Sequence, residues 1–309
     1  MHWLDTMTDM STPAALPIDS RHVQLQFGRS QDLSAAEFLH GEIAQRMMQR
    51  LRLIRLVPET LLDAGCGDGR RVTLLKERYP EAAYIGQDFS AGLLSAAKRR
   101  FPEGWKKWVR QLKGRPPKRR WIEADLASSG LAPESIELVW SNLALHWHPR
   151  PHDVIREWSR VLKPGGVVFF SCFGPSTLQE IRAAITCAQI QTSTPGFVDM
   201  HDFGDLLVEK GFGDPVMDQE IITLTYQTAD KLLQDLRALG GNPALGRRAG
   251  LCSRAWRQRL MDALESQRHE DGTIHVSIEV AYGHAWKTAI QRLPGETRIS
   301  LSAIQKKTR

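Results

Sequence analysis

Three glycines and the acid before them carry the strongest chemical signal in the chain. Gly65, Gly67 and Gly69 follow a short apolar segment that ends in Asp63. Glycines at alternate positions let the backbone bend sharply and approach a ligand, and the N–H groups of a helix that starts there point toward that ligand. The spacing G-x-G-x-G lacks the third-glycine spacing of a dinucleotide site and the Gly-Lys-Ser/Thr of a phosphate-binding loop. The pattern therefore predicts a nucleotide cradle whose ligand is not a diphosphate, with a purely structural turn as the alternative.

A second acid follows at the distance that a nucleoside site requires. Asp88 ends the next apolar segment, residues 84–88, about 20 residues beyond the glycines. A carboxylate at this point can accept two hydrogen bonds from a ribose diol. We therefore expect Asp63 and Asp88 to flank one crevice.

Alternating strands and helices would position these acids. The pattern predicts strands at 60–64, 83–88, 121–124, 136–142 and 167–173, and helices at 70–78, 91–100 and 151–162. Such alternation indicates an α/β fold with a doubly wound, mostly parallel sheet. Its ligand crevice lies at the carboxyl ends of the strands, so Ser141 and Asn142, which end the fourth strand, should face it.

The two ends of the chain depart from this alternation. Residues 1–34 read as a flexible leader, 35–56 as an amphipathic helix that caps the sheet, and 290–309 as a tail, which leaves 35–289 as the domain. Helices are predicted at 177–189 and 200–210, and strands at 216–226 and 277–286. Leucine and tryptophan spacing predicts two more helices within 227–276, a helical insertion that would form a lid over the acceptor pocket.

Composition favours a cytoplasmic protein with a buried core. The chain has 309 residues, 42% of them hydrophobic, and no apolar run of membrane-spanning length. Its four cysteines show no C-x-x-C spacing, which argues against a disulfide framework or a zinc site. His146, His148 and His152 have a plausible ligand spacing, but no cysteine or acid cluster completes a set, so we predict no metal.

The net charge of +6 is concentrated in one stretch. Eight of the fifteen residues from Lys106 to Arg120 are Lys or Arg, and three tryptophans lie in or beside the run. Such a segment could follow nucleic-acid phosphates and stack bases, or it could bind an acidic protein. A solvated loop is the third interpretation, because Gly114, Pro116 and Pro117 interrupt the run.

The segment from Leu61 to Gly69 resembles the first motif of the class I S-adenosylmethionine methyltransferases, hydrophobic-hydrophobic-Asp-x-Gly-Cys-Gly-x-Gly. The resemblance implies a Rossmann-like, seven-stranded sheet that ends in an antiparallel strand, and S-adenosylmethionine as the cofactor. It implies that Asp63 and the turn hold the aminoacyl end, that Asp88 holds the ribose, and that Phe89 and Asp125 contact the adenine. The cofactor set is then Arg29, Asp63, Gly65, Cys66, Gly67, Gly69, Asp88, Phe89, Asp125, Leu126, Ser141 and Asn142, where Cys66 supplies mainly packing and Arg29 could equally be a surface residue.

A longer stretch narrows the resemblance. The segments Ser141–Trp147, Arg160–Gly166 and above all Phe173–Arg182, with the pattern Phe-Gly-Pro-x-Thr-Leu-x-Glu-x-Arg, are similar to the malonyl-acyl-carrier-protein O-methyltransferases of biotin synthesis. That family methylates the free carboxylate of malonyl-acyl-carrier protein or malonyl-CoA, and its partner is an acidic carrier protein. A malonyl carboxylate is ionised at neutral pH, so positioning and a cationic clamp would suffice. The residues we expect at the acceptor are Arg182, Ser176, Thr177 and Arg237.

Two other functions stay open on the sequence alone. The segment Ser141–Trp147 and the Thr-Leu-x-Glu-x-Arg pattern are also similar to complex I assembly factors that hydroxylate an arginine, which would make the chain a protein-modifying enzyme or an assembly factor. The basic stretch would suit an RNA methyltransferase, although nucleic acid is the less favoured partner. A methyl ester on malonyl carrier protein, a stable protein partner, or salt-sensitive RNA binding would distinguish these three functions.

Overall fold

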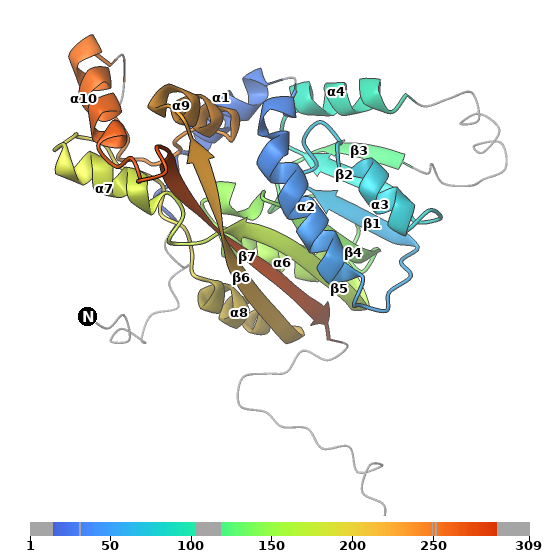
Figure 1. Ribbon diagram of the computed structural model, residues 1–309. Coiled ribbons are helices and arrows are strands. Elements are labelled where there is room, and N and C mark those ends of the chain that lie inside the picture. The colour runs from blue at the N-terminus through green and yellow to red at the C-terminus, as the bar shows by residue number, and fades with distance from the viewer. Residues whose placement is uncertain (1–14, 31, 103–118, 249, 251, 289–309) are drawn as a thin grey trace, which may run out of the picture.

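A seven-stranded sheet forms the centre of the protein (Figure 1). The computed structural model describes residues 15–30, 32–102, 119–248, 250 and 252–288. The strand order is β3-β2-β1-β4-β5-β7-β6. The strands are β1 Thr60–Ala64, β2 Ala83–Asp88, β3 Arg119–Glu123, β4 Ile136–Asn142, β5 Leu162–Phe173, β6 Phe212–Tyr226 and β7 Ile274–Lys287.

The first five strands are parallel, and β7 is antiparallel to both of its neighbours. Leu62 at the centre of the sheet pairs with Ile85 of β2 and Val139 of β4. The predicted mostly parallel sheet, with a terminal antiparallel strand, is therefore confirmed. The last three strands begin earlier than predicted, and β5 already starts at Leu162, directly after the preceding helix, with Gly165 in the left-handed region (φ 80°).

Helices cover both faces of the sheet. One apolar core packs beneath α2 (Glu37–Leu51), α3 (Val72–Arg78) and α7 (Gln179–Cys187), and the other beneath α6 (Pro151–Val161) and α8 (Met200–Glu209). Helix α4 (Ala91–Arg100) begins after Ser90, whose hydroxyl accepts a hydrogen bond from the Leu93 N–H, and Pro151 begins α6. A buried sheet with apolar cores on both faces needs strands with continuous apolar runs, and β4 and β5 contain such runs at 138–140 and 167–170.

Part of the segment expected to be a flexible leader is helical. Helix α1 spans Ser20–Arg29, and the carboxylate of Asp19 caps it by accepting a hydrogen bond from the His22 N–H. A short 3-10 turn, η1 (Ser34–Ala36), connects it to α2. The sequence of α1 is too polar to show a strong apolar stripe. The partners that hold this helix come from distant parts of the chain, so local periodicity does not reveal it.

The insertion between β6 and β7 contains the two predicted helices, α9 (Ala229–Ala238) and α10 (Arg254–Glu265). Because β7 is antiparallel to both β5 and β6, β6 runs in the same direction as β5. Its last residue, Tyr226, therefore reaches the edge of the sheet where the parallel strands end. Figure 1 shows α9 beside α1 at this edge, with α10 and α7 further out.

No helix in the described part of the chain is long and apolar enough to span a membrane. Most of the predicted basic stretch, residues 106–118, lies outside the described residues. Its last two members, Arg119 and Arg120, belong to strand β3.

Candidate active site

The glycine turn after β1 is shaped by contacts that exclude side chains. Gly65 and Gly67 have φ values of 81° and 55°. A Cβ atom on Gly65 would lie 2.3 Å from the Cβ of Ala144, so only glycine fits there. The Gly65 and Cys66 N–H groups both donate to the carbonyl of Gln87, which fixes the turn against the end of β2.

Gly69 has a different role from the other two glycines. Its φ is 77°, and a Cβ atom there would lie 2.9 Å from Cη2 of Trp121 and 3.1 Å from the Cβ of Ala97. These contacts belong to the packing of the turn against β3 and α4. Gly69 does not line the cavity described below, whereas Gly65 and Gly67 do.

Asp63 and Asp88 lie in one cavity, at the carboxyl ends of β1 and β2. Asp88 accepts hydrogen bonds from the N–H groups of Gly67 (2.9 Å) and Ser90 (2.8 Å), and burial raises its pKa to about 6. Asp63 accepts a hydrogen bond from the Tyr84 hydroxyl at 2.6 Å, and burial raises its pKa to about 7. Each carboxylate still presents oxygen lone pairs to the cavity after these contacts.

The cavity holds about 1100 Å³, including its open mouth. Five other residues of the predicted cofactor set line it: Cys66, Phe89, Asp125, Leu126 and Asn142. The His148 imidazole, 3.2 Å from Asp125, holds the pKa of that carboxyl below its usual value. Burial raises the pKa of the Cys66 thiol, so it stays protonated and contributes packing.

Besides Gly69, two members of the predicted cofactor set, Arg29 and Ser141, lie outside the cavity lining. Arg29 is exposed at the end of α1. Ser141 is buried, and its hydroxyl donates to the carbonyl of Ala64, which ties β4 to β1. The neighbouring Asn142 lines the cavity, while its side-chain amide donates to the His40 carbonyl and its side-chain oxygen accepts from the Ser171 hydroxyl.

Helix α1, part of the segment predicted to be a flexible leader, covers the cavity. Val23, Gln24 and Phe27 of this helix line it, and the Phe27 ring packs edge-on against Phe89 (6.2 Å) and Trp147 (5.2 Å). The insertion does not line the cavity but supports α1 from outside. A Cβ atom on Gly240 would lie 2.5 Å from the Trp147 ring and 2.9 Å from the Phe27 ring, so the glycine lets the insertion backbone lie directly on both.

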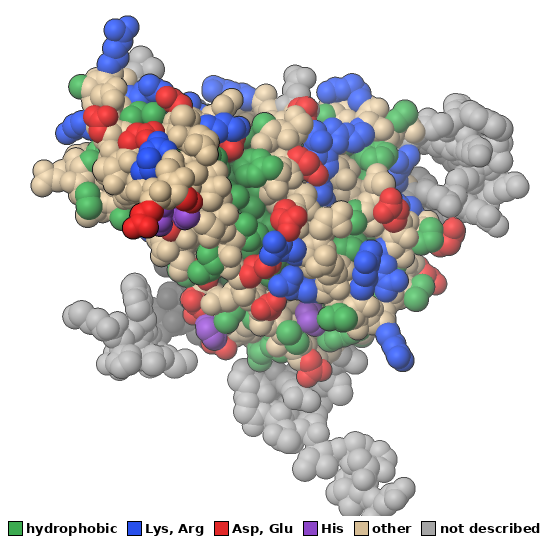
Figure 2. Space-filling view, in the orientation of Figure 1, with side chains coloured by type: hydrophobic (Ala, Val, Ile, Leu, Met, Phe, Trp, Pro, Cys, Tyr) green, Lys and Arg blue, Asp and Glu red, His purple; other side chains and the backbone are tan. Residues whose placement is uncertain are grey.

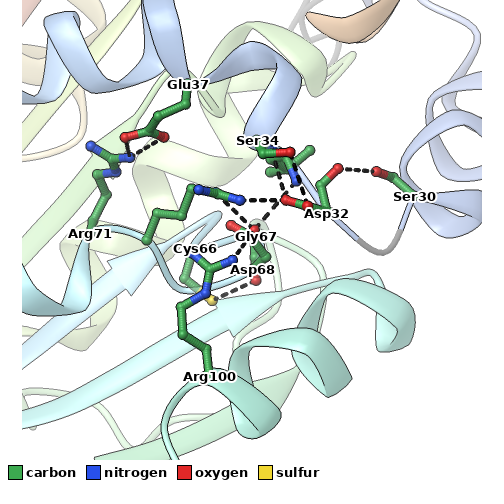
Figure 3. A network of polar contacts seen from close by, with 11 residues as sticks. Ser30, Asp32, Ser34, Glu37, Cys66, Gly67, Asp68, Arg71 and Arg100 are labelled. Atoms are coloured by element: carbon green, nitrogen blue, oxygen red, sulfur yellow. Dashed lines mark hydrogen bonds and ion pairs between the residues drawn. The ribbon is translucent and has the colours of Figure 1, made fainter.

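A polar network joins the segment before α2 to the glycine turn (Figure 3). The buried carboxylate of Asp68 accepts hydrogen bonds from the Leu33 N–H (3.3 Å), Arg70 Nε (2.9 Å) and an Arg100 nitrogen (3.0 Å). Arg70 also pairs with Asp32, and Arg71 pairs with Glu37. The charged residues Asp68, Arg70 and Arg71 at the end of the turn were the available signal, but their partners could not be read from the sequence.

The predicted acceptor residues lie together near the end of β5, apart from Arg237. The Thr177 hydroxyl donates to the Glu279 carbonyl (2.9 Å), and the Ser176 N–H donates to the Glu279 carboxylate (2.6 Å). The Arg182 guanidinium donates to the carbonyls of Thr177 and Pro175, both at 2.6 Å. Arg237 is exposed in the last turn of α9. None of the four lines the cavity.

These features fit S-adenosylmethionine. The glycine turn brings backbone close to the cavity, two strand-end carboxylates can accept hydrogen bonds from amino and hydroxyl groups, and aromatic rings flank the Phe89 end. The described residues that line the cavity include no cluster of unpaired cations for a diphosphate. The arginines of the cavity, Arg70 and Arg71, are paired with Asp32, Asp68 and Glu37.

Comparison with known proteins agrees with this chemistry. The family described as "Methyltransferase domain" matches residues 62–170. A putative methyltransferase structure from Bacillus halodurans shares the fold, with a TM-score of 0.55 and 17% identity, covering 81% of this chain and 100% of that chain.

Curated relatives cover nearly the whole chain. A malonyl-[acyl-carrier protein] O-methyltransferase from Gallionella capsiferriformans is 40% identical over 88% of this chain and 92% of its own length. One of the same name from Halorhodospira halophila is 37% identical over 97% of this chain and 100% of its own length. The cofactor of the present protein is S-adenosylmethionine. The chain belongs to the malonyl-[acyl-carrier protein] O-methyltransferase family and is an S-adenosylmethionine-dependent methyltransferase.

Proposed function

We propose that the protein methylates the free carboxylate of a malonyl group carried on an acyl-carrier protein, or on coenzyme A, early in biotin synthesis. The observation that carries the proposal is the cavity shared by Asp63 and Asp88, in a chain that is 40% identical to enzymes named for this reaction. The complex I-type and RNA-directed alternatives have no comparable support among the described residues.

The chemistry needs little from the protein beyond positioning. Bound S-adenosylmethionine supplies an electrophilic methyl group on a sulfonium sulfur. The acceptor oxygen would supply the electron pair for the new oxygen–carbon bond, and the sulfur, which leaves as a neutral thioether, would keep the pair of the broken sulfur–carbon bond. A malonyl carboxylate is ionised at neutral pH, so no general base has to remove a proton. Orientation and exclusion of water then account for the rate.

Each part of the cavity has a role in this scheme. Asp88 would accept hydrogen bonds from the ribose hydroxyls, and Asp63 would hold the aminoacyl end together with the glycine turn. Phe89 would pack on the adenine, and Asp125 would meet its amino group. Val23 and Phe27 of helix α1 line the cavity and would help to exclude water from it.

The carrier protein is proposed to be acidic, and this protein offers basic surface to receive it. Figure 2 shows Lys and Arg side chains along the upper edge of the molecule. Helices α4 and α10 lie along this edge in Figure 1, and they carry the exposed residues Lys98, Arg99 and Arg100 and the exposed residues Arg254, Arg257 and Arg259, respectively. Complementary charge speeds such an encounter and makes it sensitive to salt. A cytoplasmic location, where the carrier protein and cofactor are made, completes the proposal.

The proposed function is tested by detecting the methylated product. Purified protein, S-adenosylmethionine and malonyl-acyl-carrier protein should yield a carrier protein that is heavier by one added methyl group in intact-mass spectrometry. Acetyl-acyl-carrier protein, which lacks the free carboxylate, should gain nothing. If malonyl carrier protein and malonyl-CoA both stay unmodified at micromolar enzyme, while calorimetry shows that the cofactor binds, the acceptor assignment fails.

A further inference from the structure

His146 is a buried imidazole with one nitrogen that has no partner in the described structure. It lies in η2 (Leu145–Trp147), just after the end of β4, and is 5% exposed. Its Nδ1 accepts a hydrogen bond from the Phe173 N–H at 3.4 Å. The proton of the neutral ring is therefore on Nε2. Nε2 is buried and makes no hydrogen bond within the described residues.

A buried donor without a partner weakens a fold unless something else satisfies it. Burial lowers the pKa of His146 to about 3, and the nearby His40 lowers it further. No carboxylate contributes to this shift, so no acid on a neighbouring element supports a charged ring. His146 is therefore a neutral N–H donor throughout the physiological range.

The surroundings of His146 connect it to the cofactor cavity. The ring packs against Phe173 (4.3 Å between centroids), Trp147 (5.1 Å) and Phe197 (5.7 Å). Trp147 lines the cavity, and so does His40, which is close enough to affect the titration of His146. Through Trp147 and Phe27 the aromatic contacts continue to Phe89, where we place the adenine. His146 does not itself line the cavity; it lies next to Trp147, at the other end of the aromatic run whose members Phe27, Phe89 and Trp147 do.

We propose that the Nε2–H of His146 donates a hydrogen bond to a carboxylate oxygen of the methyl acceptor, with the aromatic side chains around it contacting the acceptor's methylene. This inference rests on the proposed function and assigns a substrate-binding residue to it. A neutral donor suits this task because it orients an ionised carboxylate without transferring a proton to it. One oxygen is held, and the other keeps its lone pairs for the methyl group.

Two substitutions separate the hydrogen bond from the shape of the side chain. His146→Gln keeps a neutral N–H donor, whereas His146→Phe keeps a planar apolar ring and removes the donor. We expect His146→Phe to raise KM for malonyl carrier protein about 10- to 100-fold, the effect of losing a hydrogen bond to a charged group. Calorimetry should show S-adenosylmethionine affinity within about twofold of wild type in both variants, and KM of His146→Gln should stay within about fivefold. Equal KM values for wild type and His146→Phe would overturn the proposal, as would equal losses in both variants.

A measurement on the unmodified protein covers the case in which His146→Phe does not fold. Protein labelled with ¹⁵N at histidine and saturated with S-adenosylhomocysteine, so that no turnover occurs, is titrated with malonyl or acetyl carrier protein. The His146 Nε2 resonance should shift with the malonyl form and not with the acetyl form. A shift with both or with neither would overturn the inference. Absence of a methyl ester with wild-type enzyme would instead refute the proposed function, so the two failures are distinguishable.

Discussion

Affinity for S-adenosylmethionine should fall as the pH is lowered through 6, and part of that loss should depend on Asp88. Burial raises the pKa of this carboxyl to about 6, while the Gly67 and Ser90 N–H groups hold it in place. The ionised carboxylate can accept hydrogen bonds from both ribose hydroxyls, whereas the protonated form has lost part of its acceptor capacity. Because the pKa of Asp88 is raised to about 6, lowering the pH through 6 protonates this carboxylate and weakens cofactor binding.

The size of the effect follows from the pKa. If only the ionised form binds, the apparent dissociation constant rises by 1 + 10^(pKa − pH), which is about 11-fold at pH 5 and negligible at pH 7.5 for a pKa of about 6. Asp88→Asn keeps the shape and removes the titration. We expect it to bind the cofactor about 10- to 100-fold more weakly at pH 7.5, the loss of a charged acceptor. Asp63, with a pKa of about 7, titrates in the same cavity, so the readout is the difference between wild type and variant.

Isothermal calorimetry at pH 5, 6 and 7.5 tests this reasoning. The ratio of dissociation constants between pH 5 and 7.5 should be about tenfold smaller in Asp88→Asn than in wild type. Wild type should also release protons on binding at pH 6, seen as an enthalpy that changes with the ionisation heat of the buffer. Asp230→Asn, an exposed carboxyl on α9, should behave like wild type. An unchanged ratio in Asp88→Asn would refute the assignment, as would an enthalpy independent of buffer.

Three structural substitutions give further outcomes. Gly69→Ala should cost about 1–3 kcal/mol in denaturant unfolding, because the residue has φ 77° and its Cβ would press on Trp121; an unchanged midpoint would contradict this. Asp68→Asn should speed hydrogen exchange of the Leu33 amide about tenfold or more, since the carboxylate that accepts this N–H also pairs with two arginines, and equal exchange rates would count against the network. Arg182→Gln should cost about 1–3 kcal/mol in unfolding, because its guanidinium holds two carbonyls of the turn after β5. If stability is instead unchanged and KM for the acceptor rises, Arg182 contacts the substrate.

The sequence predicted that Asp63 and Asp88 share one crevice, because both residues lie at strand ends. Asp63 and Asp88 close two apolar segments, and in a parallel sheet such ends meet at one edge regardless of the loops. The glycine turn follows from residue type alone, since the φ values of Gly65 and Gly67 are costly for other residues. Neither prediction requires knowledge of which distant segments of the chain meet.

The cover of the cavity could not be predicted in this way. The Asp19 N–H donates to the carbonyl of Pro243, the Asp19 carboxylate pairs with Arg247, and Ile18 forms a bridge with Ala244. These partners are more than 200 residues apart in sequence, so α1 has local polarity typical of a surface segment and gains its partners only in the folded chain. Arg71 and Glu37 are 34 residues apart, and their pairing was hidden because they lie in different elements that meet only in the folded chain.

The predicted acceptor residues show a second limit of prediction from sequence. This limit concerns the direction of their side chains and not their position in the fold. The segment after β5 was singled out as specific, but a residue type does not say which way its polar atoms point. Thr177 and Arg182 direct theirs toward the backbone of this turn and of β7, and Glu279 packs so closely on Gly174 that a Cβ there would lie 2.5 Å from it. The segment therefore acts first as a rigid support at the end of β5. What it supports includes Phe173, whose N–H fixes the tautomer of His146, so its effect on the acceptor would be exerted through that imidazole.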